Sequence, residues 1–234
     1  MMYDMLAARR RIMMTKKRGK TPSTDMVLLI NSSNSGDFSV ATSYGTFTAA
    51  KVSEYPYFDT TVTHKLSISN VTFSTGQRIS NDSTVRGLFV GVESWGTSNT
   101  YTNTAFLFDS CTNLRGIPSS WAGLAGLNNA YYMFHGCASL TSIPDSWEGL
   151  GALKTASSMF YNCASLTNCG TTFTGLAKAT DVRYLFAGCT GMQGDIHALY
   201  VYLSTKPIAV SYYSGCFRNC TQAVGYDLIP ASWK

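Results

Sequence analysis

The chain has 234 residues, which is long enough for one large domain or two small ones with a substantial hydrophobic core. Hydrophobic residues make up 45%, aromatic residues 13% and charged residues 13%; this composition excludes an intrinsically disordered protein and leaves mainly Ser, Thr, Asn, Gly and Tyr to cover the surface. The net charge of +5 arises within residues 1–20, which hold seven basic side chains and Asp4, so a uniformly basic protein is excluded.

Residues 2–14 have the spacing of a short amphipathic helix, with apolar side chains on one side and arginines across the middle. Because so short a helix is marginal alone in water, we expect it to fold against a partner. Residues 16–24, rich in Lys, Ser, Thr and Pro, predict a flexible linker. The residues expected to anchor the chain are Met5, Leu6, Arg9, Arg10, Arg11, Ile12 and Met13.

Four interpretations fit this basic arm: electrostatic binding to nucleic acid, contact with an anionic membrane surface, insertion into a protein assembly, or a solvated terminus. The apolar residues between the arginines favour insertion into a protein, since an apolar stripe needs burial; nucleic acid is not an expected partner. The apolar run at 12–14 is too short for a secretory signal, and no window approaches the roughly 18 residues of a membrane span. We therefore expect synthesis into the cytoplasm without Sec export.

From residue 26 to about residue 80, short runs of β-branched and aromatic residues alternate with clusters of Asn, Ser and Gly, which is typical of strands and turns. The expected strands are 26–30, 38–42, 46–52, 60–68 and 71–75. They predict a small antiparallel sheet or sandwich, loosely similar to the β-modules that precede repeats in bacterial surface proteins.

A repeat of 26 residues occupies the second half of the chain. The residues that recur at this interval are Phe108, Phe134, Phe160 and Phe186; Cys111, Cys137, Cys163 and Cys189; and Leu114, Leu140, Leu166 and Met192. The pattern Ile-Pro-x-Ser-Trp occupies 117–121, 143–147 and 229–233, and a weaker form occupies 169–173. Leu88 and Trp95 lie one interval before Leu114 and Trp121, so a degenerate first unit is expected near Val85.

Such self-similarity indicates stacked supersecondary units, since one unit alone buries too little apolar surface to fold. The spacing from Phe186 to Phe217 is 31 residues, so the extra residues around 197–207 predict a helix or a bulge, and the last unit is expected to be a cap.

The motif Met-Phe-x-x-Cys-x-x-Leu-x-x-Ile-Pro-x-Ser-Trp, clearest at 133–147, resembles the BspA-like, Treponema-type leucine-rich repeat, and the resemblance covers residues 85–234. That family occurs on bacterial surfaces, in mycoplasmas and in some phage-encoded proteins. The resemblance implies a curved solenoid with a short parallel strand at each Leu-x-x-Ile segment. The expected fold class is thus mainly β with irregular or short helical connections: a leucine-rich-repeat-like solenoid after a small antiparallel β module and an N-terminal amphipathic helix.

Five of the seven cysteines hold one repeat position: Cys111, Cys137, Cys163, Cys189 and Cys220. They predict a ladder of buried thiols inside successive turns, because free Cys packs as a small hydrophobe. Cys169 stands where Ile117 and Ile143 stand and is interpreted in the same way. A disulfide, for which Cys216 and Cys220 are the closest pair, and a metal site are the alternatives. We expect no metal and no cofactor.

The three histidines, His64, His135 and His197, fit no metal-ligand spacing, and no nucleophile elbow or phosphate-binding loop is present. His135 and Asp109 share one repeat position on adjacent units, so they are expected to be neighbours. A solvated repeat position is the favoured interpretation of this pair, and a catalytic pair is the alternative; Asp195 and His197 are interpreted likewise. We expect no catalytic residue and no enzyme.

The candidate binding residues are those that vary while the repeat frame stays constant. One group precedes each Phe and the other lies between the core Leu and Ile; Tyr with Ser and Asn is a favourable palette for binding. The candidates are Tyr131, Tyr132, Arg183, Tyr184, Arg115, Thr141, Asn168 and Gln193. Tyr212 and Tyr213 are assigned to the first group in the last unit, and ordinary solvent exposure is the alternative for all of them.

The expected organisation is an anchoring arm and linker at 1–24, a β-sandwich-like module at 25–82 and the solenoid at 83–234. The expected function is a non-enzymatic structural or adhesive component of a bacteriophage virion, like a head or tail fibre. Other virion proteins would hold its N-terminal arm, and a host or mucosal surface glycan or protein would bind its solenoid; homo-oligomerisation is also considered. The alternatives are a bacterial cell-surface adhesin and an intracellular partner-binding scaffold.

Overall fold

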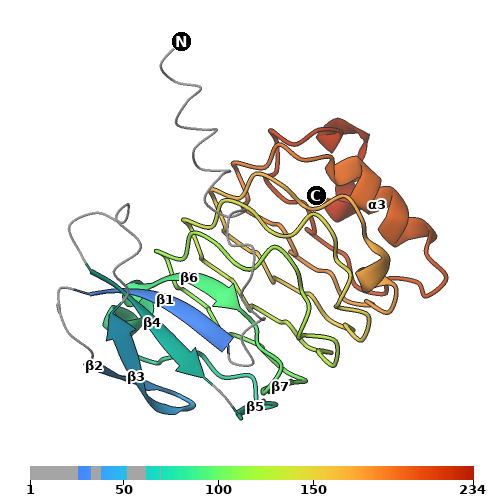
Figure 1. The fold of residues 1–234 in the computed structure, drawn as a ribbon. Helices are drawn as coiled ribbons and strands as arrows, with labels where there is room; N and C mark the ends of the chain where they lie inside the picture. Colours follow the sequence, from blue (N-terminus) through green and yellow to red (C-terminus); the bar gives the residue numbers. More distant parts are fainter. Residues whose placement is uncertain (1–25, 33–37, 52–61, 69) are drawn as a thin grey trace.

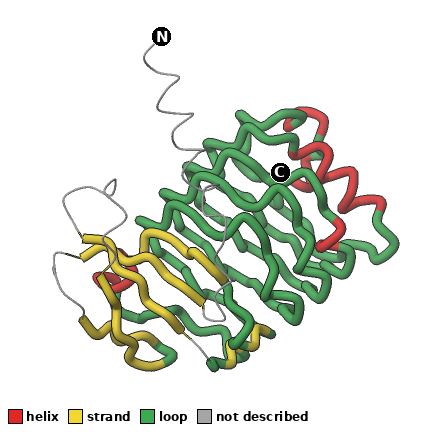
Figure 2. The backbone as a smooth tube through the Cα atoms, viewed as in Figure 1, coloured by secondary structure: helices red, strands yellow, loops and turns green. Residues whose placement is uncertain are grey.

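The computed structural model describes residues 26–32, 38–51, 62–68 and 70–234, and its regular structure is mainly β with a few short helices (Figure 1). The strands gather at one end of the molecule, and the chain then winds through stacked turns toward a helix at the other end. Figure 2 shows that these turns consist mostly of loops. The helix expected at 2–14, its anchor residues and the linker at 16–24 lie outside the described residues.

Five strands form one antiparallel sheet in the order β2-β3-β4-β1-β6. They are β1 (Met26–Ser32), β2 (Phe38–Thr42), β3 (Gly45–Lys51), β4 (Val62–Ile68) and β6 (Phe89–Ser94). Successive side chains of a strand point to opposite faces, and the paired residues Leu28 and Leu66, like Met26 and Ile68, are fully buried on one face. The sheet therefore packs against the core that continues into the stacked turns.

The strands expected at 26–30, 38–42, 46–52 and 60–68 are confirmed, with ends that differ by at most two residues. The run at 71–75 forms only β5 (Thr72–Phe73), which pairs in parallel with β7 (Thr100–Tyr101) instead of joining the larger sheet. The sequence was compatible with either a small antiparallel sheet or a sandwich, and the structure shows a sheet.

Strand β6 belongs to both the sheet and the stack of turns. Its one edge pairs with β1, and on its other edge the Val92 N–H donates to Gly116 O at 3.0 Å while Val90 O accepts from the Arg115 N–H at 2.9 Å. Hydrogen bonds between successive turns begin at Val71, whose carbonyl accepts from the Thr100 N–H at 3.0 Å. The stack thus starts before Val85, where the repeat pattern first becomes visible; the division at residues 82 and 83 stays a prediction.

Parallel bridges join the turns at one position of each unit, before the Met-Phe pair. The bridged residues are Asn103, Asn129, Thr155, Asp181 and Tyr212, each linked to the next. The side chain of Asn129 also accepts the N–H of Tyr131 at 2.9 Å, and the equivalent side chains of the other three polar residues do the same two residues ahead. These side-chain turns set the direction in which the chain enters each unit.

The strand expected at each Leu-x-x-Ile segment is not formed, so that prediction is wrong. The segment at 114–117 pairs with β6 through the parallel Gly91–Gly116 bridge, whereas only isolated backbone hydrogen bonds join the later segments, as between the Thr167 N–H and Thr141 O at 3.0 Å. A longer ladder is prevented at Ile143 because the Asn168 side chain takes both of its backbone groups, the N–H and the carbonyl, at 3.0 Å each. The following Pro144 lacks an N–H to donate.

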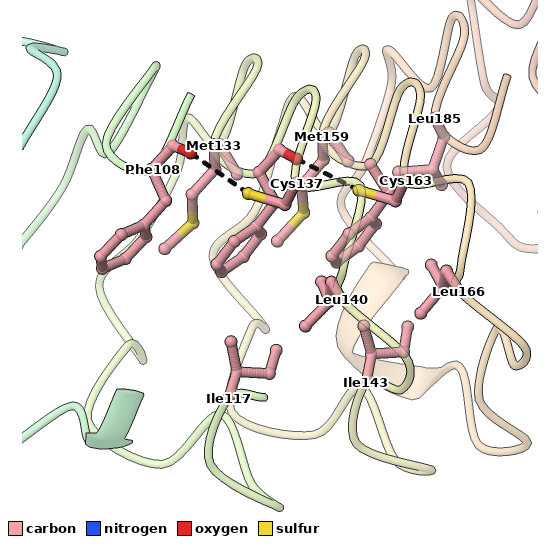
Figure 3. Close-up of a cluster of buried hydrophobic side chains, with 14 of the residues drawn as sticks. Phe108, Ile117, Met133, Cys137, Leu140, Ile143, Met159, Cys163, Leu166 and Leu185 are labelled. Carbon is pink, nitrogen blue, oxygen red and sulfur yellow. Dashed lines mark hydrogen bonds between the residues drawn. The ribbon is translucent and has the colours of Figure 1, made fainter. Parts of the chain in front are cut away.

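Ladders of identical side chains fill the core (Figure 3). The rings of Phe108, Phe134, Phe160 and Phe186 stack 5.4–5.5 Å apart and nearly parallel. Four thiols of the cysteine ladder, those of Cys137, Cys163, Cys189 and Cys220, donate to the Phe carbonyl of the preceding turn, as from Cys137 to Phe108 at 3.2 Å. The predicted thiol ladder is confirmed, and all seven cysteines, Cys169 and Cys216 included, are buried and free.

The inserted residues form α3 (Ile196–Thr205), as expected. Its N-cap Asp195 accepts from the Ala198 N–H at 2.9 Å, and Leu199 and Leu203 bury one face of the helix. Buried Lys206 ends the helix and donates from Nζ to the carbonyls of Ala177, Ala179 and Ile208, which pins α3 to the stack. Burial lowers the pKa of Lys206.

The remaining helices are short. They are α2 (Ser83–Leu88), η1 (Thr174–Leu176), η2 (Tyr226–Leu228) and η3 (Ala231–Trp233). In the last unit the Phe217 N–H donates to Trp233 O at 3.0 Å, and the Trp233 ring stacks on Tyr213 at 4.5 Å. This unit caps the stack, as the 31-residue spacing predicted. None of the helices in the described ranges has the length and apolar character of a membrane span.

Candidate functional site

A row of aromatic side chains runs across successive turns on the side where the chain enters each unit. We call it the aromatic stripe, and its members are Phe106, Tyr131, Tyr132, His135, Tyr161 and Tyr184. Neighbouring ring centroids in it lie 4.4–6.2 Å apart, and Tyr131 and Tyr184 are exposed, at 37% and 36%. The stripe brings together three of the sequence-predicted candidates, Tyr131, Tyr132 and Tyr184.

The backbone beneath the stripe is left-handed. Phe106, Tyr132 and Tyr184 have φ of 65°, 56° and 53°, and the equivalent residues of the other units are Ser158 and Gly215. This region suits glycine and is uncommon for bulky residues, which incur roughly 1–2 kcal/mol there. Large rings thus occupy positions where the local backbone favours a residue without a side chain.

A buried charge cluster orients His135. Asp109 is almost completely buried; its Oδ1 lies 2.7 Å from Nδ1 of His135, and its Oδ2 accepts from Nε of Arg78 at 2.7 Å. Burial opposes ionisation of Asp109, but the hydrogen bonds from His135 and Arg78 outweigh it, so its pKa is lowered. The predicted neighbourhood of Asp109 and His135 is confirmed. The interpretation of the pair as a solvated position is wrong for Asp109, because the Arg78 side chain and the next turn cover it.

Arg183 lies at the far end of the stripe and is also paired. Its guanidinium donates to both carboxylate oxygens of Asp181, at 3.0 and 2.8 Å, and lies over the Tyr212 ring at 4.8 Å. Tyr212 bridges to Asp181, so Tyr212 and Tyr213 occupy the positions of Asp181 and Val182. From the sequence, Tyr212 and Tyr213 were assigned to the positions of Arg183 and Tyr184. This assignment is wrong, because Ser214 and Gly215 occupy those positions in the last unit.

The second group of candidates lies elsewhere. Met133, next to the tyrosine pair, and Ile143, next to Thr141 and Ser142, are on opposite sides of the core in Figure 3. Arg115, Thr141 and Gln193 are exposed, whereas Asn168 is half-buried and holds Ile143 and Asp145. A hollow of about 310 Å³ lies nearby, lined by residues 117–119 and 142–146. The structure does not join the two groups into one surface.

The hydroxyl and thiol groups of this region have defined partners or surroundings. The Ser110 hydroxyl donates to Asp109 Oδ1 at 3.1 Å. Burial raises the pKa of Cys163 and Cys169 to about 12 and that of Cys137 well above its usual value, which keeps these thiols protonated. No group of three or more potential metal ligands occurs among the described residues.

Sequence reasoning missed Phe106, Tyr161 and Arg78. The signal for the first two was present, because Phe106 stands 26 residues before Tyr132 and Tyr161 stands 26 after His135. Arg78 carried no signal, since it lies before the visible repeat and reaches Asp109 only through the fold.

Stacked 26-residue turns with internal ladders of Phe, Trp and Cys define a repeat protein. The family model described as "Mycoplasma protein of unknown function, DUF285" matches residues 77–199, about half of the chain, and the chain belongs to this family. The match is compatible with the resemblance to BspA-like repeat proteins. Searches of curated proteins and of solved structures each found no match.

Proposed function

We propose that this protein is a non-enzymatic display scaffold: a leucine-rich-repeat-like solenoid that presents the aromatic stripe to a glycan or protein on a host or mucosal surface. The observation that carries the proposal is the row of rings on a rigid frame. A scaffold of stacked units with buried ladders keeps the spacing of such a surface constant, and preorganised tyrosines contribute contact area at low entropic cost.

The position of the left-handed residues supports display. Aromatic side chains that serve only the core stay within the buried ladder, as Phe108 and Phe134 do. Tyr132 and Tyr184 instead lie on strained backbone and remain partly open to solvent. Strain of this kind persists at sites where it serves binding.

For attachment, we propose the virion of a bacteriophage, with residues 1–24 inserted into a head or tail assembly. The support is the sequence of the basic amphipathic arm. The second candidate is a bacterial cell-surface adhesin; the family description supports it only in that it names proteins of a bacterium, Mycoplasma. Copurification of the chain with phage particles, lost on removal of residues 1–20, supports the first; recovery on intact bacterial surfaces supports the second.

The display function is tested by retention of the full chain on mucin-coated surfaces and on whole bacterial cells. The test variant combines Tyr131→Ala with Arg183→Ala, and the matched control combines Thr141→Ala with Gln193→Ala on the other side of the core. We expect the control to be retained like the parent protein and the test variant to be washed off. Equal retention of both variants contradicts the proposed function.

A further inference from the structure

The ligand class of the aromatic stripe follows from its charges. Between Phe106 and Tyr184 the stripe meets two cations, and both have partners: Arg78 is paired with Asp109, and Arg183 with Asp181. Nucleic acids and acidic polysaccharides are held chiefly by cations that replace their counterions. Within the described residues, the two cations that contact the stripe are both paired, and exposed Arg218 stands beyond its last ring, at the repeat position of His135 and Tyr161. Between Phe106 and Tyr184 the chemistry of the surface therefore favours a neutral ligand.

His135 supplies a fixed polar group at the centre of the stripe. Asp109 holds Nδ1, and the ring lies 4.6 Å from the Tyr132 ring and 5.3 Å from the Tyr161 ring. About a quarter of the His135 side chain is exposed, and within the described part of the chain Nε2 has no hydrogen-bond partner. A preoriented nitrogen between two aromatic rings suits a hydroxyl group that projects from a flat, apolar ring.

The third unit has small residues where the neighbouring units have aromatic ones. Ser157 and Ser158 are small and buried, and they separate Tyr132 on one side from Tyr184 on the other. Tyr132 and Tyr184 lie two turns apart, and the Phe ladder shows that each turn advances by about 5.4 Å. The exposed parts of side chains at such an interval can contact separate members of a chain-like ligand.

We propose that the aromatic stripe is a binding site for a neutral saccharide, with sugar faces on Tyr132, Tyr161 and Tyr184 and a sugar hydroxyl bonded to His135 Nε2. This inference rests on the proposed display function and names its ligand. The chemistry of a neutral saccharide matches that of the stripe. Its apolar C–H faces can pack on the aromatic rings, its hydroxyl groups can hydrogen-bond to the imidazole, and it carries no net charge.

The test measures binding of the full chain to chitohexaose, cellohexaose and maltohexaose by calorimetry, with heparin and oligothymidine as anionic probes. The variants Tyr132→Gly and Tyr184→Gly remove a ring and retain the left-handed backbone, and Ser158→Gly is the matched control at the same position of the neighbouring unit. We expect a neutral oligosaccharide to bind, a loss of at least about tenfold in affinity for each tyrosine variant, and no change for the control. Circular dichroism verifies that each variant is folded.

The proposal is overturned if the three neutral oligosaccharides all fail to bind at millimolar concentration, if only the anionic probes bind, or if folded tyrosine variants bind like the parent. His135→Ala is a second probe, expected to weaken binding about tenfold without loss of the fold. Mucin whose glycans have been oxidised by periodate separates the saccharide hypothesis from the display function. If the protein is still retained on oxidised mucin, and the stripe variants are not, the saccharide hypothesis is wrong and the display function is supported.

Discussion

Asp109 and His135 occupy the same position of adjacent turns, and the Oδ1 atom of one lies 2.7 Å from the Nδ1 atom of the other. The contact arises because parallel stacking places residues 26 positions apart side by side. A buried carboxylate without a partner would be unfavourable. Here the carboxylate of Asp109 is paired, and it orients the partly exposed imidazole of His135.

Loss of this carboxylate should destabilise the protein in a manner that depends on pH. Asp109→Asn is expected to lower the free energy of unfolding by about 2–3 kcal/mol at neutral pH, because hydrogen bonds to a charged group are lost. The folded pKa of Asp109 is lowered, so its contribution is present above the unfolded value near 3.9 and is lost as pH falls through the folded value. Urea titrations of both proteins between about pH 7 and pH 2 measure the difference. A difference that stays constant down to the lowest pH contradicts this account.

The thiols should be inert in the folded protein. All seven cysteines are buried, and burial raises the pKa of several to about 12. N-ethylmaleimide is therefore expected to leave the native protein unmodified and to add seven groups after denaturation without reductant, as counted by mass spectrometry. Five additions would reveal a disulfide, with Cys216 and Cys220 as the pair to inspect.

The left-handed position predicts opposite effects at two units. Ser158→Gly is expected to stabilise the protein by about 0.5–1 kcal/mol, because relief of backbone strain exceeds the added entropy of glycine in the unfolded chain. Gly215→Ala should destabilise it by about 1–2 kcal/mol, since a Cβ there meets the Tyr184 ring and φ is positive. Thermal unfolding resolves both signs; a stabilising Gly215→Ala would show that strain is absent.

The glycines two residues after Trp121, Trp147 and Phe173 pack on the backbone of the preceding turn. A Cβ added at Gly175 would overlap the carbonyl oxygen of Trp147, whereas one added at Gly151 meets no atom within 4 Å. Gly175→Ala is expected to cost about 3 kcal/mol, or roughly 6–12 °C in melting temperature. Gly151→Ala, the matched control, should be neutral or stabilising by up to about 1 kcal/mol. Equal melting temperatures for the two variants would show that the turns are packed less closely.

The repeat period, the buried ladders, the inserted helix and four strands of the sheet were predictable from the sequence. These features follow from local rules: a position that is buried in every turn must be apolar in every turn, and alternation along a strand is visible without its partner. The Phe, Cys and Trp ladders were predictable for that reason, and so was the contact between Asp109 and His135.

Which exposed positions come into contact depends on how distant segments pack in three dimensions. The aromatic stripe combines rings from four turns, and its chemistry depends on Arg78, which reaches Asp109 from a turn that the repeat pattern does not reveal. The parallel bridges form at Asn129 and its equivalents because side chains there turn the backbone, whereas Asn168 occupies the backbone groups of the segment that was expected to form a strand. Periodicity shows that turns stack, but side-chain hydrogen bonds and the approach of distant segments select the edge that pairs and the face that is displayed.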